Sequence, residues 1–166
     1  MDIHEQQGIA LEILRKLEII DPTCILAGGA PRDWYFDKPA KDLDFFVYLR
    51  PDLQEHYIRR QLASVGMTDL VSKGMGNMEF PENYKRNPEV RYVYERLFGG
   101  IMVQIIVMLS PTFQSVVPNF PLGICQAWWK GRDVKYTKEF TSSIQNKELK
   151  ILNELYADGD GYITKI

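Results

Sequence analysis

The chain has 166 residues, of which 45% are hydrophobic and 25% charged, and its formal net charge is −2. This length and balance are ordinary for one folded domain with a buried core. No apolar run approaches the ~20 residues that span a bilayer, and the polar start Met1–Glu5 is unlike a signal peptide. We therefore expect no membrane partner. The expected location is the cytoplasm, or the cytoplasm of the host if the protein is viral.

The two cysteines, Cys24 and Cys125, are far apart in the sequence and lack CxxC spacing. Such an arrangement predicts neither a zinc site nor a disulfide framework, and both thiols are expected in the core. The slightly negative net charge gives no basic footprint over the whole domain, so charge alone does not indicate a nucleic-acid partner.

Two segments have apolar residues at helical spacing. In residues 8–19 the apolar positions include Ile9, Ile13 and Leu17, and residues 52–65 repeat the pattern with Leu53, Ile58, Leu62 and others. Spacing of this kind predicts helices that bury one face. We expect both segments to pack against the rest of the domain.

Between these helices, a short apolar run, Cys24–Ala27, ends at two adjacent glycines. The run suits a buried strand, and glycines permit backbone conformations in which consecutive amides close on an anion. Pro31 fits the first turn of a helix, so residues 31–36 are expected to form a short helix that begins at the same place. Strand, glycine turn and helix together predict a cradle for a phosphate group.

Residues 42–48, with the sequence DLDFFVY, have strand composition and place Asp42 and Asp44 on one face. Magnesium prefers oxygen ligands and often binds one or two carboxylates plus substrate phosphates, so this pair fits a metal site. Metal ions in such a site stabilise the entering and leaving oxygens of a phosphoryl group. Alone, a Gly-Gly pair is usually a tight turn and Asp-x-Asp a solvated strand edge. Their combination in this order predicts nucleotidyl transfer.

The remaining chain completes a mixed architecture. Residues 90–97 and 101–108 are expected to form an antiparallel hairpin about Gly99-Gly100, residues 74–88 a loop, and residues 137–156 packing helices. The expected fold is α+β, with a small, mostly antiparallel sheet flanked by helices. We expect one domain over residues 1–166, with a core at about 8–130 and a helical part at about 137–156.

Two segments combine basic and aromatic residues. The first holds Lys85, Arg86, Arg91 and Arg96; the second holds Lys130, Arg132, Lys135 and Lys138 among Trp128, Trp129 and Tyr136. Basic and aromatic residues together can hold single-stranded nucleic acid by charge and by stacking. A solvated charged face with the aromatics in the core is the favoured interpretation, but an RNA acceptor would bind here first.

The stretch GGAPRDWYFDKPAKDLDFFV resembles the head domain of tRNA CCA-adding enzymes and bacterial poly(A) polymerases, in the DNA polymerase β-like nucleotidyltransferase superfamily. The strong likeness covers residues 24–48, and a looser one continues to about residue 130. The chain is most similar to short, single-domain members found in phages and large viruses.

The resemblance implies a role for each motif residue. Gly28 and Gly29 would hold the triphosphate of an NTP, and Asp42 and Asp44 would bind Mg²⁺ or Mn²⁺ and act in catalysis. Pocket and phosphate contacts would come from Arg32, Asp33 and Lys41. The acceptor hydroxyl would be the 3′ end of an RNA, particularly tRNA, although a protein or small-molecule hydroxyl is compatible with the same core.

One position departs from the family pattern. The family has a third carboxylate on a later strand, and the counterpart here, Ile101–Met108, offers only Gln104. Gln104 is either part of the site or a buried polar group satisfied by a neighbouring backbone. An amide cannot take up a proton as a general base, so catalysis is slow, is absent, or uses Glu79, Glu89 or Glu95. The alternative to an enzyme is a nucleotide-binding or regulatory module, for example antitoxin-like, on the same fold.

Overall fold

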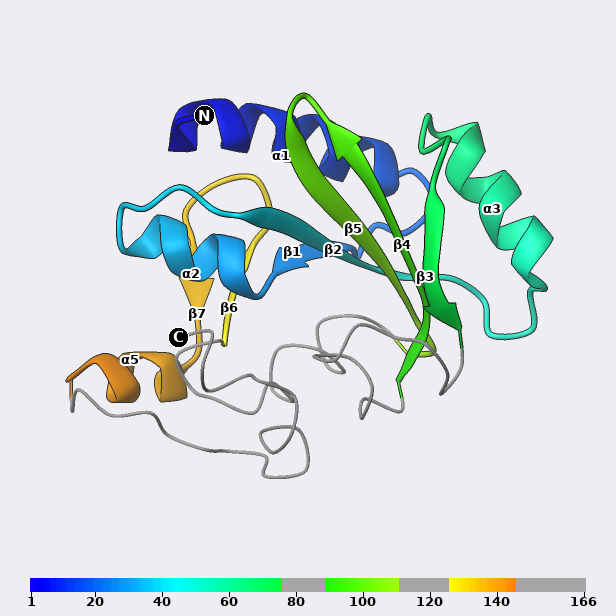
Figure 1. Ribbon diagram of the computed structural model, residues 1–166. Helices are drawn as coiled ribbons and strands as arrows, with labels where there is room; N and C mark the ends of the chain where they lie inside the picture. Colours follow the sequence, from blue (N-terminus) through cyan, green and yellow to red (C-terminus); the bar gives the residue numbers. More distant parts are fainter. Residues whose placement is uncertain (76–88, 111–125, 146–166) are drawn as a thin grey trace.

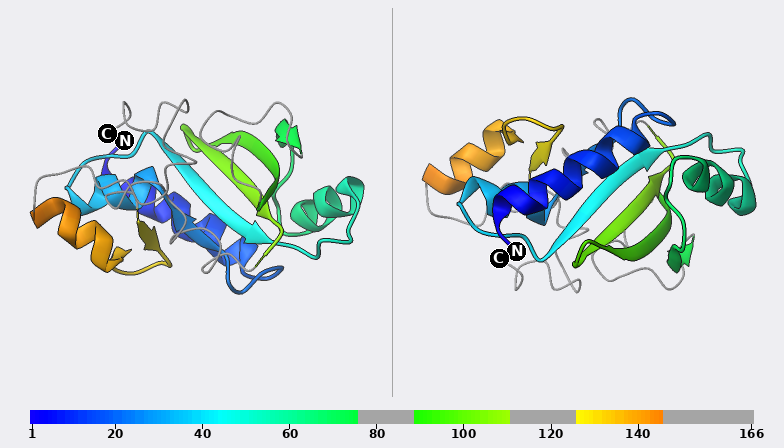
Figure 2. Two further views of the ribbon diagram at one scale, coloured as in Figure 1. Left: turned by 90° about the horizontal axis from the view of Figure 1, so that it is seen from below. Right: turned by 90° about the horizontal axis from the view of Figure 1, so that it is seen from above.

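The structure is a computed structural model that describes residues 1–75, 89–110 and 126–145. One mixed sheet of seven strands runs through it in the order β3-β4-β5-β2-β1-β6-β7 (Figure 1). Seen from above, α1 lies over the sheet and runs along β2 (Figure 2). No helix in these three ranges is long and apolar enough to cross a membrane. The α+β fold expected from the sequence is confirmed.

Four helices are present in the described ranges: α1 (Ile3–Leu17), α2 (Gly29–Tyr35), α3 (Glu55–Ser64) and α5 (Lys138–Gln145). The first helix begins five residues earlier than its apolar spacing predicts, because Asp2 caps it and accepts a hydrogen bond from the Glu5 amide at 2.8 Å. Helix α5 falls within the helical region expected at residues 137–156, and residues 146–156 lie outside the described residues.

The strands are β1 (Ile25–Ala27), β2 (Asp42–Tyr48), β3 (Val71–Met75), β4 (Val90–Phe98), β5 (Ile101–Met108), β6 (Ala127–Trp129) and β7 (Lys135–Tyr136). Strands β2 and β5 pair in parallel, and the other neighbouring pairs are antiparallel. The expected hairpin is present as β4 and β5, and its two glycines have φ of 56° and 93°, which suits a tight hairpin turn. The expected loop at 74–88 begins inside β3 at residues 74 and 75, and the rest of it lies outside the described residues.

The largest cluster of buried residues lies on one face of the sheet. Leu43, Phe45 and Val47 of β2 point to this face and pack with buried residues from α1, α2 and α3. Because side chains alternate along a strand, Asp42 and Asp44 lie on the opposite face. Strand β2 therefore anchors the core with one set of side chains and presents its carboxylates with the other.

A buried glutamine joins α1 to the segment between α2 and β2. Gln6, only 2% exposed, donates through its amide nitrogen to the Ala40 carbonyl at 2.8 Å. Its amide oxygen accepts from the Ala40 amide at 2.8 Å and from the Trp34 indole nitrogen at 2.9 Å. One side chain thus satisfies three buried groups and fixes the position of α2 relative to β2.

Replacing Gln6 tests this connection. We expect Gln6→Ala to lower the free energy of unfolding by about 3 kcal/mol, because three buried polar groups lose their partner. The exposed Gln54, which precedes α3 and makes no capping hydrogen bond, is the matched control, and Gln54→Ala should change stability by less than about 0.5 kcal/mol. Urea unfolding followed by circular dichroism measures both. Equal costs for the two variants would contradict the role given to Gln6.

Candidate active site

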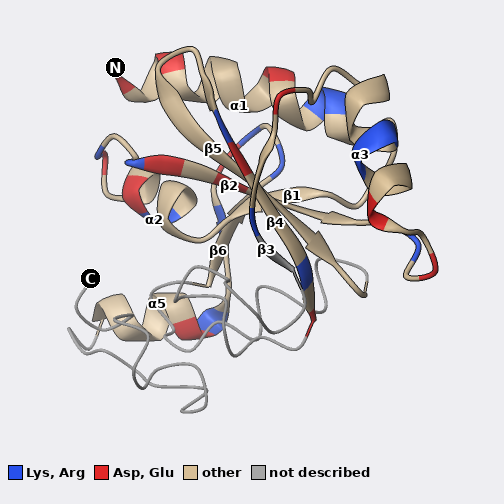
Figure 3. Cartoon of the chain, turned by 45° about the vertical axis from the view of Figure 1, so that its right-hand side comes forward, with Lys and Arg blue, Asp and Glu red and all other residues tan. Residues whose placement is uncertain are grey.

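The glycine turn and the two aspartates lie side by side. Ala27, the last residue of β1, pairs with Asp44 of β2, and Gly28 follows directly. Gly28 has φ +85°, and a Cβ built on it would lie 3.8 Å from Asp44 Oδ2. The backbone of the turn therefore runs past the Asp44 carboxylate. Figure 3 shows the acidic start of β2 next to α2, the helix that follows the turn.

Asp42 and Asp44 share one face of β2, and both are partly exposed. Within the described ranges, no group of three His, Cys, Asp or Glu side chains is close enough together to hold a metal ion. The donor set still fits Mg²⁺ or Mn²⁺, since such ions often take one or two carboxylates and complete their shell with water and substrate phosphates. Gly28 has no side chain to cover the Asp44 carboxylate, and a Cβ built there would lie 3.8 Å from Asp44 Oδ2.

The predicted pocket residues Arg32 and Asp33 are paired with each other. Their side chains meet at 3.2 Å and are 19% and 22% exposed. A Cβ built on Gly29 would lie 3.4 Å from Arg32 Nη2, so the guanidinium lies beside the glycine turn. Lys41 is exposed and directly precedes Asp42. The structure thus groups Arg32 and Asp33 with the turn and leaves Lys41 at its edge.

Gln104 lies next to Asp44 in the sheet. The parallel pairing of β2 and β5 sets Asp44 opposite Gln104, and the hairpin pairing sets Gln104 opposite Glu95. Directly paired residues project to the same face. Glu95 therefore lies on the face of the sheet that carries Asp42 and Asp44, which we call the site face. Of the other two glutamates named as substitutes for the missing carboxylate, Glu89 accepts a hydrogen bond from Ser110, and Glu79 is outside the described residues.

Several basic residues of the two segments that combine basic and aromatic residues make hydrogen bonds to carbonyls of neighbouring segments instead of facing solvent alone. Arg91 donates to the carbonyls of Arg50 and Leu53, and Arg96 donates to that of Thr68.

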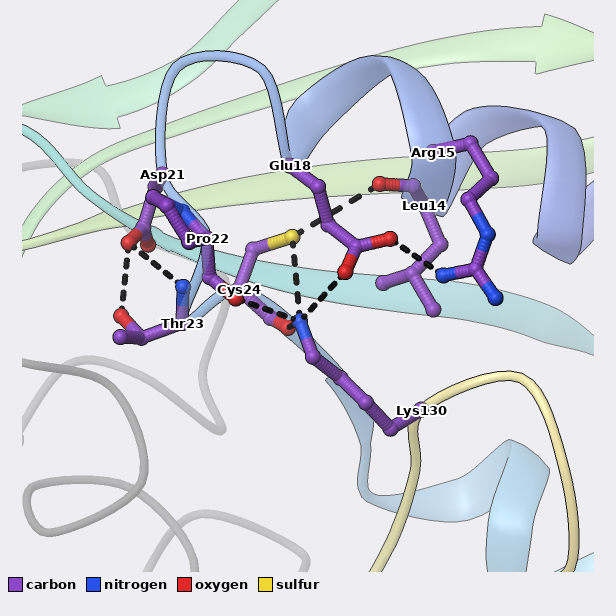
Figure 4. Close-up of polar contacts among 8 residues, drawn as sticks. All are labelled: Leu14, Arg15, Glu18, Asp21, Pro22, Thr23, Cys24 and Lys130. Atoms are coloured by element: carbon purple, nitrogen blue, oxygen red, sulfur yellow. Dashed lines mark hydrogen bonds and ion pairs between the residues drawn. The ribbon is translucent and has the colours of Figure 1, made fainter.

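Lys130 donates to the Pro22 and Cys24 carbonyls and pairs with Glu18 at 3.3 Å (Figure 4). The Cys24 thiol beside it donates to the Leu14 carbonyl, and burial raises its pKa to about 12. Lys130 therefore ties the end of β6 to the connection between α1 and β1. Cys24 is in the core as expected, and Cys125, Lys85 and Arg86 lie outside the described residues.

The two tryptophans next to Lys130, Trp128 and Trp129, lie on opposite faces of the sheet. Trp129 is buried and packs edge to face on Trp34, with ring centroids 5.3 Å apart. Trp128 is partly exposed on the site face, where Ala27 lies between it and Asp44 in the sheet. The sequence does not distinguish the two, because only the strand pairing decides which face each side chain takes.

A cluster of aromatic rings lies where α2, β7 and α5 meet; we call it the aromatic surface. It consists of Tyr35, Phe36, Tyr136 and Phe140, and the ring centroids of Tyr35 lie 5.0–5.4 Å from those of the other three. Tyr35 is 43% exposed, Phe36 40% and Tyr136 45%. Two exposed lysines, Lys135 and Lys138, are near Tyr136 in the sequence, and Lys135 pairs with Trp128 on the opposite face of the sheet from Tyr136. The aromatic surface therefore offers three open rings, those of Tyr35, Phe36 and Tyr136.

Substitution of the two glycines tests the geometry of the turn. Gly28 has φ +85° and ψ −133°, which L-residues rarely adopt, so Gly28→Ala should lower the free energy of unfolding by about 2 kcal/mol. Gly29 is the first residue of α2 and meets only the end of the Arg32 side chain. Gly29→Ala should stay within about 1 kcal/mol of the wild type, since alanine favours helix. A smaller loss for Gly28→Ala than for Gly29→Ala, measured by urea unfolding, would contradict the described turn.

No family model matches the sequence, and no curated protein matches it. The fold is similar to that of the Bacillus stearothermophilus CCA-adding enzyme in complex with CTP, with TM-score 0.61 and 11% identity over 89% of this chain. It is also similar to the Thermotoga maritima CCA-adding enzyme complexed with tRNA, with TM-score 0.56 and 13% identity over 94% of this chain.

These matches cover 33% and 37% of the two enzymes, so this chain spans about a third of their length. At such identities the likeness establishes the fold alone. The chain has the nucleotidyltransferase fold of the CCA-adding enzymes.

Proposed function

We propose that the chain is a nucleotidyltransferase that uses Mg²⁺ or Mn²⁺ to move a nucleoside monophosphate from an NTP to an acceptor hydroxyl, with release of pyrophosphate. One observation carries the proposal: Gly28 lies so close to the Asp44 carboxylate that a Cβ built on it would be 3.8 Å from Asp44 Oδ2, and the same strand also presents Asp42. A phosphate cradle and a pair of metal-binding carboxylates are the two parts that this transfer needs.

Each part of the site has a distinct task in the proposed reaction. The amides of the glycine turn bind the triphosphate, and Arg32, held by Asp33, adds positive charge beside the turn. Asp42 and Asp44 would hold a divalent cation, which when bound would stabilise negative charge on the α-phosphate and on the attacking oxygen. The acceptor oxygen bonds to the α-phosphorus as the bond to the pyrophosphate oxygen breaks, and the hydroxyl proton passes to solvent. Because β2 is fixed by its core face, both carboxylates are preorganised for this step.

The acceptor we propose is the 3′ end of an RNA, such as a tRNA. The T. maritima enzyme of similar fold was solved complexed with tRNA, which makes RNA the first candidate. The aromatic surface supports it, because open aromatic rings can stack on unpaired bases.

A second candidate function is nucleotide binding without transfer, in a regulatory module. It is favoured by Gln104, which pairs with Asp44 where the resembling enzymes have a carboxylate. An amide at this place supplies an oxygen ligand but neither negative charge nor a proton acceptor. Such a protein binds NTP and forms no product.

Transfer itself can be measured with purified protein, each α-labelled NTP, Mn²⁺ or Mg²⁺, and total tRNA. We expect label on RNA with the wild type and a loss of at least about 10³-fold with Asp42→Asn/Asp44→Asn, because the cation loses both carboxylate ligands. Asparagine has the same shape as aspartate, so the double variant is expected to fold. Its circular dichroism spectrum serves as the control.

Each outcome of that assay selects one account. Label on the protein or on a small molecule would replace RNA by another acceptor. NTP binding without any product would support the regulatory module. Equal transfer by the wild type and the double variant would remove the proposed mechanism.

RNA binding by the aromatic surface can be tested with a matched pair of variants, at Tyr136 and Tyr57. Both side chains are 45% exposed, and only Tyr136 belongs to the aromatic surface. We expect Tyr136→Ala to weaken binding of a labelled single-stranded RNA about tenfold, because one stacked base is worth roughly 1–3 kcal/mol. Tyr57→Ala on α3 should leave the affinity unchanged. Fluorescence anisotropy measures both, and equal affinities for the two variants would exclude the aromatic surface as the RNA site.

A further inference from the structure

The row of side chains beside Asp44 continues one strand beyond Gln104. Strand pairing places Glu95 opposite Gln104 and Gln104 opposite Asp44, and all three project to the site face. Neighbouring strands are about 4.8 Å apart, so the Cα atoms of Glu95 and Asp44 are separated by about 10 Å with Gln104 between them. The glutamine thus has a carboxylate residue on each side.

We propose that Glu95 is a positioning residue of the candidate site, which acts on the metal through the Gln104 amide. The inference rests on the proposed function. In the enzymes that this chain resembles, one carboxylate supplies both an oxygen ligand and a negative charge. Here Gln104 supplies the oxygen and Glu95 the charge.

The chemistry of the amide carries the assignment. A glutamine side chain ends in an oxygen that accepts and a nitrogen that only donates. A cation held by Asp44 requires the oxygen on its side, so the amide nitrogen must face the other way. Glu95 lies on that other side and can accept a hydrogen bond from the nitrogen. Without an acceptor there, the amide can turn over and place its N–H groups against the cation.

In the structure, Glu95 is paired with Lys73 of the edge strand β3. The two side chains meet at 3.1 Å and are 19% exposed for Glu95 and 43% exposed for Lys73. An ion pair whose lysine is this exposed contributes little to stability. Lys73 instead competes with Gln104 for the Glu95 carboxylate and neutralises its charge.

Two explanations of Glu95 therefore predict different effects of removing Lys73. If Glu95 serves only the ion pair between β3 and β4, then Glu95→Gln and Lys73→Met break the same interaction and have equal effects. If Glu95 orients Gln104, then Lys73→Met frees the Glu95 carboxylate and preserves or strengthens metal binding, whereas Glu95→Gln weakens metal binding.

The test is Mn²⁺ binding by the full chain without nucleotide, measured by electron paramagnetic resonance. We expect Glu95→Gln to weaken binding about fivefold or more and Lys73→Met to keep or tighten it. The exchange Glu95→Gln/Gln104→Glu moves the carboxylate next to Asp44 and should restore binding at least to the wild-type level. Glu12→Gln removes the same charge from the exposed face of α1 and should have no effect.

The outcomes separate this inference from the proposed function. Equal weakening by Glu95→Gln and Lys73→Met, or no weakening by Glu95→Gln, would overturn the role of Glu95. In that case a large loss with Asp44→Asn would leave the proposed metal site intact. If Asp44→Asn has no effect on Mn²⁺ binding, the proposed site and the inference both fail.

Discussion

The antiparallel pairing of β1 with β2 is the interaction on which the site depends. It sets Ala27 opposite Asp44, and the chain then turns at Gly28 past the Asp44 carboxylate. Neither motif has a specific chemical meaning alone. Side by side, a turn with open backbone and a strand with two carboxylates on one face can hold a phosphate and a cation together.

The alternation of side chains along β2 gives this strand two tasks at once. Leu43, Phe45 and Val47 bury one face against the helices, and this burial fixes the strand that carries Asp42 and Asp44 on the other face. Gln6 extends the same principle to α2, because its three hydrogen bonds fix the start of β2 relative to the helix after the glycine turn. The geometry of the site is therefore set by packing on the opposite side of the sheet.

Local patterns predicted the central part of the fold well. The strand at residues 42–48 and the hairpin about Gly99 and Gly100 follow from composition and turn chemistry, and both are present. The edge strand β3 was not predicted, because residues 71–73 are exposed and show no apolar alternation. The sequence groups Lys130 with residues that could contact RNA, since its carbonyl partners, 106 and 108 residues away, leave no local signal. The alignment of Glu95, Gln104 and Asp44 likewise depends on the pairing of distant strands, so the sequence named Glu95 as one of three options and could not select it.

The most direct test of the central claim is a crystal structure of the chain with Mn²⁺ and a non-hydrolysable NTP, in which anomalous scattering locates the metal. The account predicts a manganese peak within coordination distance of Asp42 and Asp44, with the triphosphate on the amides of Gly28 and Gly29. A triphosphate bound elsewhere, with no manganese at the two aspartates, would contradict it.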